Sequence, residues 1–346
     1  MLLSFVYDVQ AQKSNGKTSD LDFIINEVET NYAGFIDKTD TPAKKAAYDK
    51  LKTSLYNKVK KGKATDLNAV GEYIAWFEDI HLRSGLVEHQ KYRKKKNVSY
   101  AGEYNPQPMA TKVDDNTFLI RFPSCGGDPS IEWSNNAIAQ YFSSGSENLI
   151  LDIRGNGGGD DMMYAPYLDL LYDTSGETEG VEIRNTPAHL KYLEGRVGME
   201  GMEWLKEVID NMKVSKADFV TLVGNHTIEM DSVCRLPKKA ALIIDGYVAS
   251  SGEQLTLELR ICSKRTTIYG KDNTLGCLDY SNIRRVDLPL AGISTWIPMT
   301  RFMRLPDESV DAEGIAPDVR ITLPQPAKLT DNVDEWVLWV AKNMNQ

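Results

Sequence analysis

Two stretches of sequence, LILDIRGNGGG at residues 149–159 and AALIIDGYVASSGE at residues 240–253, decide the fold of this chain. Each begins with a short apolar run that passes into glycines or small polar residues. A run of this kind suits a buried strand followed by a sharp turn into a helix. The repeated pattern predicts an α/β domain with a largely parallel sheet. Both turns are then expected at the carboxyl ends of their strands, where ligand sites form in such sheets.

Outside these two stretches, apolar runs and the spacing of apolar residues predict the remaining strands and helices and so the domains. FLIRF at 118–122 indicates another strand, and residues 131–142, 160–172 and 251–262 indicate helices. Apolar residues at helical spacing predict three earlier helices, at 18–36, from Pro42 to Gly62, and near 67–77. We therefore expect a small helical N-terminal domain at 18–86, a polar linker at 87–110, and an α/β core at 111–346. Residues 173–236 fit no simple strand–helix unit and are interpreted as an insertion.

The N-terminus favours export. Residues 1–7 (MLLSFVY) are apolar, and Val9-Gln10-Ala11 is similar to the small-residue end of a signal peptide. Residues 1–17 are therefore interpreted as a signal remnant or a disordered N-terminus. A periplasmic, outer-envelope or secreted location is expected, and a cytoplasmic one stays open.

Composition narrows the classes of partner and cofactor. The 346 residues are 42% hydrophobic and 26% charged, which is ordinary for a globular protein. A net charge of -9 argues against nucleic acid, and the basic run Lys91 to Lys96 is interpreted as a solvated loop. No window approaches the roughly 20 apolar residues of a membrane span. Four cysteines without CxxC spacing and four histidines without HExxH give no support for a metal site, and no cofactor is expected.

The glycine turn at 154–160 (RGNGGGD) is the first candidate for chemistry. Amide groups exposed by Gly157 and Gly158 at a helix N-terminus can bind an anion or an oxyanion. A dinucleotide site is excluded because the GxGxxG pattern would need glycine where Asp160 stands. The alternative is a tight turn that needs glycine for steric reasons alone.

The second candidate is Ser250, at the next predicted strand-to-helix junction. Its hydroxyl is a candidate nucleophile, and the amide of Ser251 could help to hold an oxyanion. The competing interpretation is helix capping, with Ser250 as the N-cap and Glu253 as its capping-box partner. The residues alone leave both interpretations open.

Four motifs taken in order give a family resemblance. The two stretches above, then TTIYGKDNTLG at 266–276 and DAEGIAPDV at 311–319, resemble the serine peptidases that include the C-terminal processing (tail-specific) proteases and the tricorn core protease. They also resemble the retinoid-binding protein modules of the same fold. The resemblance spans residues 18–325. It implies a crotonase-like (Clp protease-like) catalytic core, serine endopeptidase activity, and a peptide or protein substrate.

The resemblance also implies roles for individual residues. Ser250 corresponds to the nucleophile and Glu253 to its supporting carboxylate. Ser251 and either Gly157 or Gly158 would supply the backbone donors of an oxyanion hole. The tail-specific branch has its catalytic Lys where this chain has Cys277, and Lys271 nearby is a weak alternative base. The tricorn-like branch uses a His from the helical region, which here corresponds to His81 in Asp79-Ile80-His81.

The remaining implications concern the third catalytic group and the architecture. Glu313, before Gly314, would orient His81, and Asp311 is a rival. Only 36 residues separate His81 from the strand at Phe118, too few for the PDZ domain that many tail-specific proteases carry. The alternative function is a non-catalytic member of the fold that binds an apolar ligand or a protein.

Overall fold

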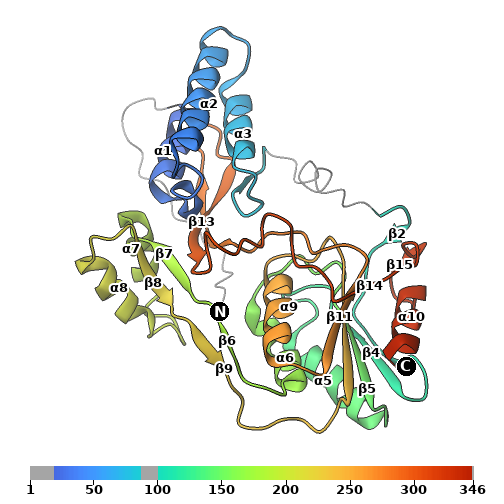
Figure 1. Ribbon diagram of the computed structural model, residues 1–346. Helices are drawn as coiled ribbons and strands as arrows, with labels where there is room; N and C mark the ends of the chain where they lie inside the picture. Colours follow the sequence, from blue (N-terminus) through green and yellow to red (C-terminus); the bar gives the residue numbers. More distant parts are fainter. Residues whose placement is uncertain (1–18, 87–99, 345–346) are drawn as a thin grey trace.

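The structure is a computed structural model that describes residues 19–86 and 100–344 (Figure 1). The predicted signal remnant, the basic run Lys91 to Lys96 and much of the predicted linker lie outside these residues. Within them, no helix is both long enough and apolar enough to cross a membrane.

A six-stranded sheet forms the core that carries the two deciding stretches. Its strand order is β14-β11-β10-β5-β4-β3, and every pairing is parallel except β3 with β4. The strands are β3 (Met109–Lys112), β4 (Thr117–Arg121), β5 (Asn148–Asp152), β10 (Lys239–Ile244), β11 (Thr266–Gly270) and β14 (Val319–Arg320). The prediction of a largely parallel α/β sheet is therefore confirmed, and β5 and β10 are neighbours at its centre.

Helices cover both faces of this sheet (Figure 1). On one face lie α5 (Ile131–Ser143), the 3-10 turn η2 (Asp161–Met163), α6 (Ala165–Leu171) and α9 (Ser251–Cys262). On the other lies α10 (Glu335–Met344), which packs Trp336, Val337 and Val340 against β5 and β10. Because both faces are covered, the central strands are apolar throughout rather than alternating.

A second sheet joins the N-terminal part of the chain to the insertion. Its order is β1-β13-β7-β8, with β12 also paired to β13. The strands are β1 (Arg83–Ser84), β7 (Val181–Arg184), β8 (Phe219–Val223), β12 (Tyr280–Asp287) and β13 (Ser294–Phe302). Helices α7 (Pro187–Glu194) and α8 (Leu205–Val214) pack on it. Two small pairs complete the strands: β6 (Gly176–Thr178) with β9 (His226–Ile228), and β2 (Glu103–Tyr104) with β15 (Lys328–Leu329).

The helical region contains α1 (Asp20–Asn31), the 3-10 turn η1 (Ala33–Phe35), α2 (Pro42–Lys60) and α3 (Asp66–Trp76). Ser19, Thr41 and Thr65 cap the three helices by accepting a backbone N–H three residues ahead. The apolar faces of these helices share one core with Tyr280, Val286, Leu288 and Ile297 of β12 and β13 and the segment that follows β12. The helical region is thus fixed to the second sheet, although about 200 residues separate them along the chain.

The elements agree closely with the sequence pattern. The predicted helix at 251–262 has the bounds of α9, and the strand expected from the apolar run that begins at Ala240 is β10, which starts one residue earlier. The first predicted helix, 18–36, instead ends at Asn31 and is followed by η1. The helix expected at 160–172 is divided into η2 and α6, with Pro166 at the start of α6.

Candidate active site

Ser250 occupies a strained turn between β10 and α9. Its backbone has φ 53° and ψ -121°, a conformation that residues other than glycine seldom adopt. Such a turn lifts a side chain out of the strand end, as in nucleophile elbows. Ser250 is indeed the N-cap residue of α9, and its N–H donates to Oε2 of Glu253 at 3.1 Å, one half of the capping box. The same capping box has the Ser250 side chain accepting from the backbone of Glu253, and the hydroxyl also lies 3.2 Å from Nε2 of His81, a contact that helix capping does not require.

Glu253 is the carboxylate that holds the serine loop to a second loop. The side chain is fully buried. Oε1 accepts hydrogen bonds from the hydroxyl of Thr274 at 2.6 Å and from the N–H of Gly276 at 2.7 Å. Oε2 accepts from the N–H groups of Cys277 at 2.8 Å and of Ser250 at 3.1 Å. Burial raises the pKa of Glu253, and these four donors oppose that rise by favouring the anion.

The glycine turn after β5 lies directly against Ser250. A side chain at Gly158 would place a Cβ 2.6 Å from the Cβ of Ser250, so only glycine fits there. The N–H of Gly158 already donates to Oδ1 of Asn156 at 3.0 Å, which removes it as a free donor. Within the described chain, the N–H groups of Gly157 and Ser251 make no such bond. Of the two predicted glycine donors, the structure therefore leaves Gly157 open.

A buried network of charges fixes the start of that turn. Arg121 and Arg154 both bind Asp152 and Asp334, with nitrogen–oxygen distances between 2.6 and 3.1 Å and all four side chains fully inaccessible. Burial would raise the pKa of Asp152, but the two guanidinium groups hold it down at about 2. Because Asp334 also caps α10, the network ties the ends of β4 and β5 to that helix.

His81 reaches Ser250 from the helical region. Its Nε2 lies 3.2 Å from Oγ of Ser250, and its Nδ1 lies 2.5 Å from the backbone carbonyl of Tyr280 at the start of β12. The backbone N–H of His81 donates to Oδ1 of Asp79 at 2.8 Å. The other carboxylate oxygen, Oδ2 of Asp79, accepts from the hydroxyl of Tyr32 at 2.7 Å. Both the helical region and the second sheet therefore fix the imidazole.

The predicted orienting residue, Glu313, is not at the imidazole. Glu313 lies on an exposed turn, where its backbone carbonyl accepts from Nδ2 of Asn273. Its rival, Asp311, accepts hydrogen bonds from the backbone N–H groups of Leu278 and Asp279. The backbone carbonyl of Tyr280 occupies the position expected for a carboxylate. Sequence could not have revealed it, because every residue has a carbonyl.

The structure also places the alternative base, Lys271, and Cys277, which stands at the position of the missing lysine. The ammonium group of Lys271 donates to the carbonyl of Leu323 at 2.9 Å and is not directed at Ser250. Cys277 is buried in a small apolar cluster with Ala249, Leu275 and Ile80, and this burial raises the pKa of its thiol well above 9.0. The thiol is therefore neutral at pH 7.

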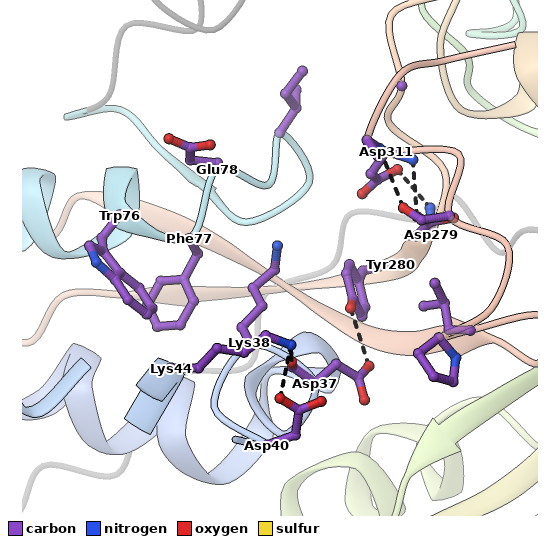
Figure 2. A pocket seen from close by; sticks show the side chains of 16 residues that line it. Asp37, Lys38, Asp40, Lys44, Trp76, Phe77, Glu78, Asp279, Tyr280 and Asp311 are labelled. Carbon is purple, nitrogen blue, oxygen red and sulfur yellow. Dashed lines mark hydrogen bonds and ion pairs between the residues drawn. The ribbon is translucent and has the colours of Figure 1, made fainter. Parts of the chain in front are cut away.

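A pocket of about 730 Å³ lies behind His81, between the helical region and the loops around β12 (Figure 2). Charged groups line it, and most are already paired. Asp37 accepts from the hydroxyl of Tyr280 at 3.1 Å, and Lys44 forms an ion pair with Asp40 at 2.8 Å. Lys38 lies over the ring of Tyr280. These contacts fasten the helical region to the residue whose carbonyl faces His81. In the described segments, no cluster of three or more metal-binding side chains occurs.

The comparisons agree with this geometry. Residues 116–321 match Peptidase family S41, and because the match covers more than half of the chain, the protein belongs to this family. It is a serine peptidase with a crotonase-like core, and its substrate is a peptide or protein. No protein of curated function matches the sequence.

Several solved structures are similar to this chain, and the first of those described here shows the fold. A candidate peptidase from Parabacteroides merdae is 14% identical, with a TM-score of 0.57 over 89% of this chain and 91% of that chain. A lipoprotein from Streptococcus agalactiae is 15% identical, with a TM-score of 0.49 over 91% and 96% of the two chains. Mature CPAF complexed with lactacystin is 18% identical, with a TM-score of 0.47 over 59% and 47%.

The buried hydrogen bonds of Glu253 predict a large cost for Glu253→Gln. The amide would direct an N–H₂ group at backbone N–H donors, so at least one donor would be left unsatisfied. We expect a loss of about 3 kcal/mol in the free energy of unfolding, measured by denaturant titration. The control is Glu313→Gln, at an exposed carboxylate, which should change stability little. Equal stability of the two variants would contradict the role given to Glu253.

The positive φ of Ser250 predicts that removing its Cβ relieves strain. Ser250→Gly should have a free energy of unfolding about 1 kcal/mol larger than that of Ser250→Ala, because alanine keeps the strained Cβ and glycine does not. Denaturant titration of the two variants measures this difference. Both variants lack the hydroxyl, so the comparison isolates the backbone. An alanine variant as stable as the glycine variant would show that the turn is unstrained.

Proposed function

We propose that this peptidase cleaves internal peptide bonds with Ser250 as the nucleophile and His81 as the general base. The observation that carries the proposal is the 3.2 Å approach of Nε2 of His81 to Oγ of Ser250, which are 169 residues apart in the chain. A serine hydroxyl is a weak nucleophile until a base within hydrogen-bond reach can take its proton.

The tautomer of His81 follows from its other contact. A carbonyl oxygen can only accept, so Nδ1, 2.5 Å from the carbonyl of Tyr280, carries the proton. Nε2 is then the unprotonated nitrogen and can accept from the Ser250 hydroxyl. In the reaction, Oγ attacks the peptide carbonyl while Nε2 takes the hydroxyl proton. The resulting imidazolium donates that proton to the leaving amine.

The carbonyl of Tyr280 and the carboxylate of Asp79 take over the positioning assigned to the third member of a triad. Tyr280 fixes the ring orientation, and Asp79 binds the backbone of His81. The negative charge of Asp79 also favours the imidazolium that forms during attack. The site is therefore a Ser–His pair with a backbone orienting group.

We assign the oxyanion hole to the N–H groups of Gly157 and Ser251. The space that a Cβ on Gly158 would fill lies 3.0 Å from the Ser251 nitrogen, so the glycine turn and the start of α9 adjoin. One such donor typically lowers the barrier by about 3 kcal/mol. The competing expectation, an apolar-ligand protein, gains no support from the pocket behind His81, whose lining is rich in charge.

Substitutions should separate the histidine base from the thiol. Ser250→Ala and His81→Ala should each lower kcat by several orders of magnitude while the protein stays folded, since each removes a group that acts in the chemical step. Cys277→Ala should keep substantial activity because the neutral thiol is not a base and its backbone contacts remain. Turnover of an internally quenched peptide library measures all three. An essential Cys277 beside a dispensable His81 would reverse the assignment.

The pH profile should report the environment of His81. Burial lowers the pKa of His81 below its ordinary value of 6.5, and the positive Arg83 adds to this, while Asp79 and the Tyr280 carbonyl oppose it. The base must be neutral to act, so kcat/KM should rise with pH through a limb below 6.5.

The same profile has two informative variants. Asp79→Asn removes a charge that favours the imidazolium, so its limb should move to still lower pH. Lys271→Ala should leave the limb in place, since the Lys271 side chain is bound elsewhere. A limb that moves in the Lys271 variant and not in the Asp79 variant would exclude His81 as the base.

A further inference from the structure

Among the described residues, Arg83 has no counter-ion, although it lies close in sequence to the proposed catalytic His81. It lies in β1, two residues after His81, and its side chain is partly buried. Its guanidinium lies over the ring of Trp296, 5.2 Å from the centroid. Within residues 19–86 and 100–344 it forms no hydrogen bond or ion pair, and its Nε is buried without a partner.

This isolation sets Arg83 apart from comparable arginines. Arg284, Arg301 and Arg304 all have a carboxylate at hydrogen-bonding distance. Burial without such a partner lowers the pKa of Arg83, which shows that its charged form is poorly solvated. A half-buried charge that lacks a partner destabilises the folded chain, so a partner supplied from outside would recover that energy.

Arg83 begins β1 two residues after His81, whose Nε2 lies 3.2 Å from Oγ of Ser250, so a partner of Arg83 would lie near the reaction centre. The charge of Arg83 lowers the pKa of His81, after burial, and also acts on the thiol of Cys277. Two residues of chain span at most about 7 Å. A peptide whose scissile carbonyl lies at Ser250 would therefore bring a group one or two residues away within reach of the guanidinium.

We propose that Arg83 binds a carboxylate of the substrate, one or two residues from the bond that is cleaved. This inference rests on the proposed function, because it takes Ser250 as the point of attack. A guanidinium presents two parallel N–H groups that match a carboxylate, and that of Arg83 lies over the ring of Trp296. The carboxylate is either the C-terminus of the peptide or the side chain of Asp or Glu.

Matched peptides test the inference and distinguish the two sources. The two peptides of the first pair differ only at the C-terminus close to the cleaved bond, which is an acid in one and an amide in the other. Both peptides of the second pair have an amidated C-terminus, and they differ only in an internal residue, which is Glu in one and Gln in the other. Wild-type protein should prefer the acid of one pair by about tenfold or more in kcat/KM. Arg83→Gln should abolish that preference, and Arg83→Lys should restore part of it. A preference for the acid in the first pair would identify the C-terminus as the carboxylate that Arg83 binds. A preference for Glu in the second pair would identify an acidic side chain.

Arg285 supplies the matched control. Trp296 of β13 has two cross-strand neighbours, Arg83 of β1 on one side and Arg285 of β12 on the other. Unlike Arg83, Arg285 already binds a carboxylate, that of Asp287, at 3.2 Å. Arg285→Gln should therefore leave the preference unchanged. No acid preference in wild type, or one that survives Arg83→Gln, overturns the inference.

A binding measurement keeps this inference separate from the proposed function. Ser250→Ala protein should bind the preferred acid peptide more tightly than its neutral partner, and Ser250→Ala/Arg83→Gln should not. Calorimetric titration of both proteins with all four peptides gives this result whether or not Ser250 is the nucleophile. Hydrolysis that survives in Ser250→Ala would refute the proposed function alone, whereas equal affinity for acid and neutral peptides would refute the role of Arg83.

Discussion

The buried carboxylate of Glu253 is the interaction on which the rest of the site depends. It accepts four hydrogen bonds, from the backbone of Ser250 and from three groups in the 274–277 loop. An isolated carboxylate in this position would be very costly, and the donors offset that cost. The same contacts bring the end of β10 to the loop after β11. The Ser250 turn is held in its strained form because Glu253 and the Cys277 carbonyl both bind its N–H.

The proposed base, His81, is held by a different part of the molecule. His81 follows α3, yet its ring is oriented by the first residue of β12 and its backbone by Asp79. The shared core of the helical region with β12 and β13 makes this geometry rigid, because the two cannot move independently without exposing apolar surface. A base supplied this way needs no lysine after the Thr-Leu-Gly loop. Cys277 can therefore lie in an apolar cluster, where a charged ammonium would be costly.

The second sheet connects the proposed base to the proposed binding site at Arg83. β1 carries Arg83 just after the loop of His81, and its partner β13 carries Trp296 beneath the guanidinium. The insertion contributes β7 and β8 to this sheet and shares a core with residues that follow the active-site loop, such as Leu278 and Ile315. The segment that fitted no strand–helix unit in the sequence thus supports the edge of the site. Its part in the fold is to complete a sheet, which no local pattern could show.

The sequence by itself determined the parallel sheet, the helices that cover it and the two turns at its carboxyl edge. Apolar runs, glycines and capping residues act over a few neighbours, so they can be read locally. It also singled out Ser250, Glu253 and His81, by motif order and by the absence of the expected lysine. Only the tertiary structure decided that the Tyr280 carbonyl, and not Glu313, lies at His81, that the N–H of Gly158 is already bonded, and that no described residue acts as a counter-ion to Arg83. These features depend on which groups from distant parts of the chain come into contact. A contact with a backbone carbonyl, or the lack of a partner, leaves no recognisable pattern in the sequence.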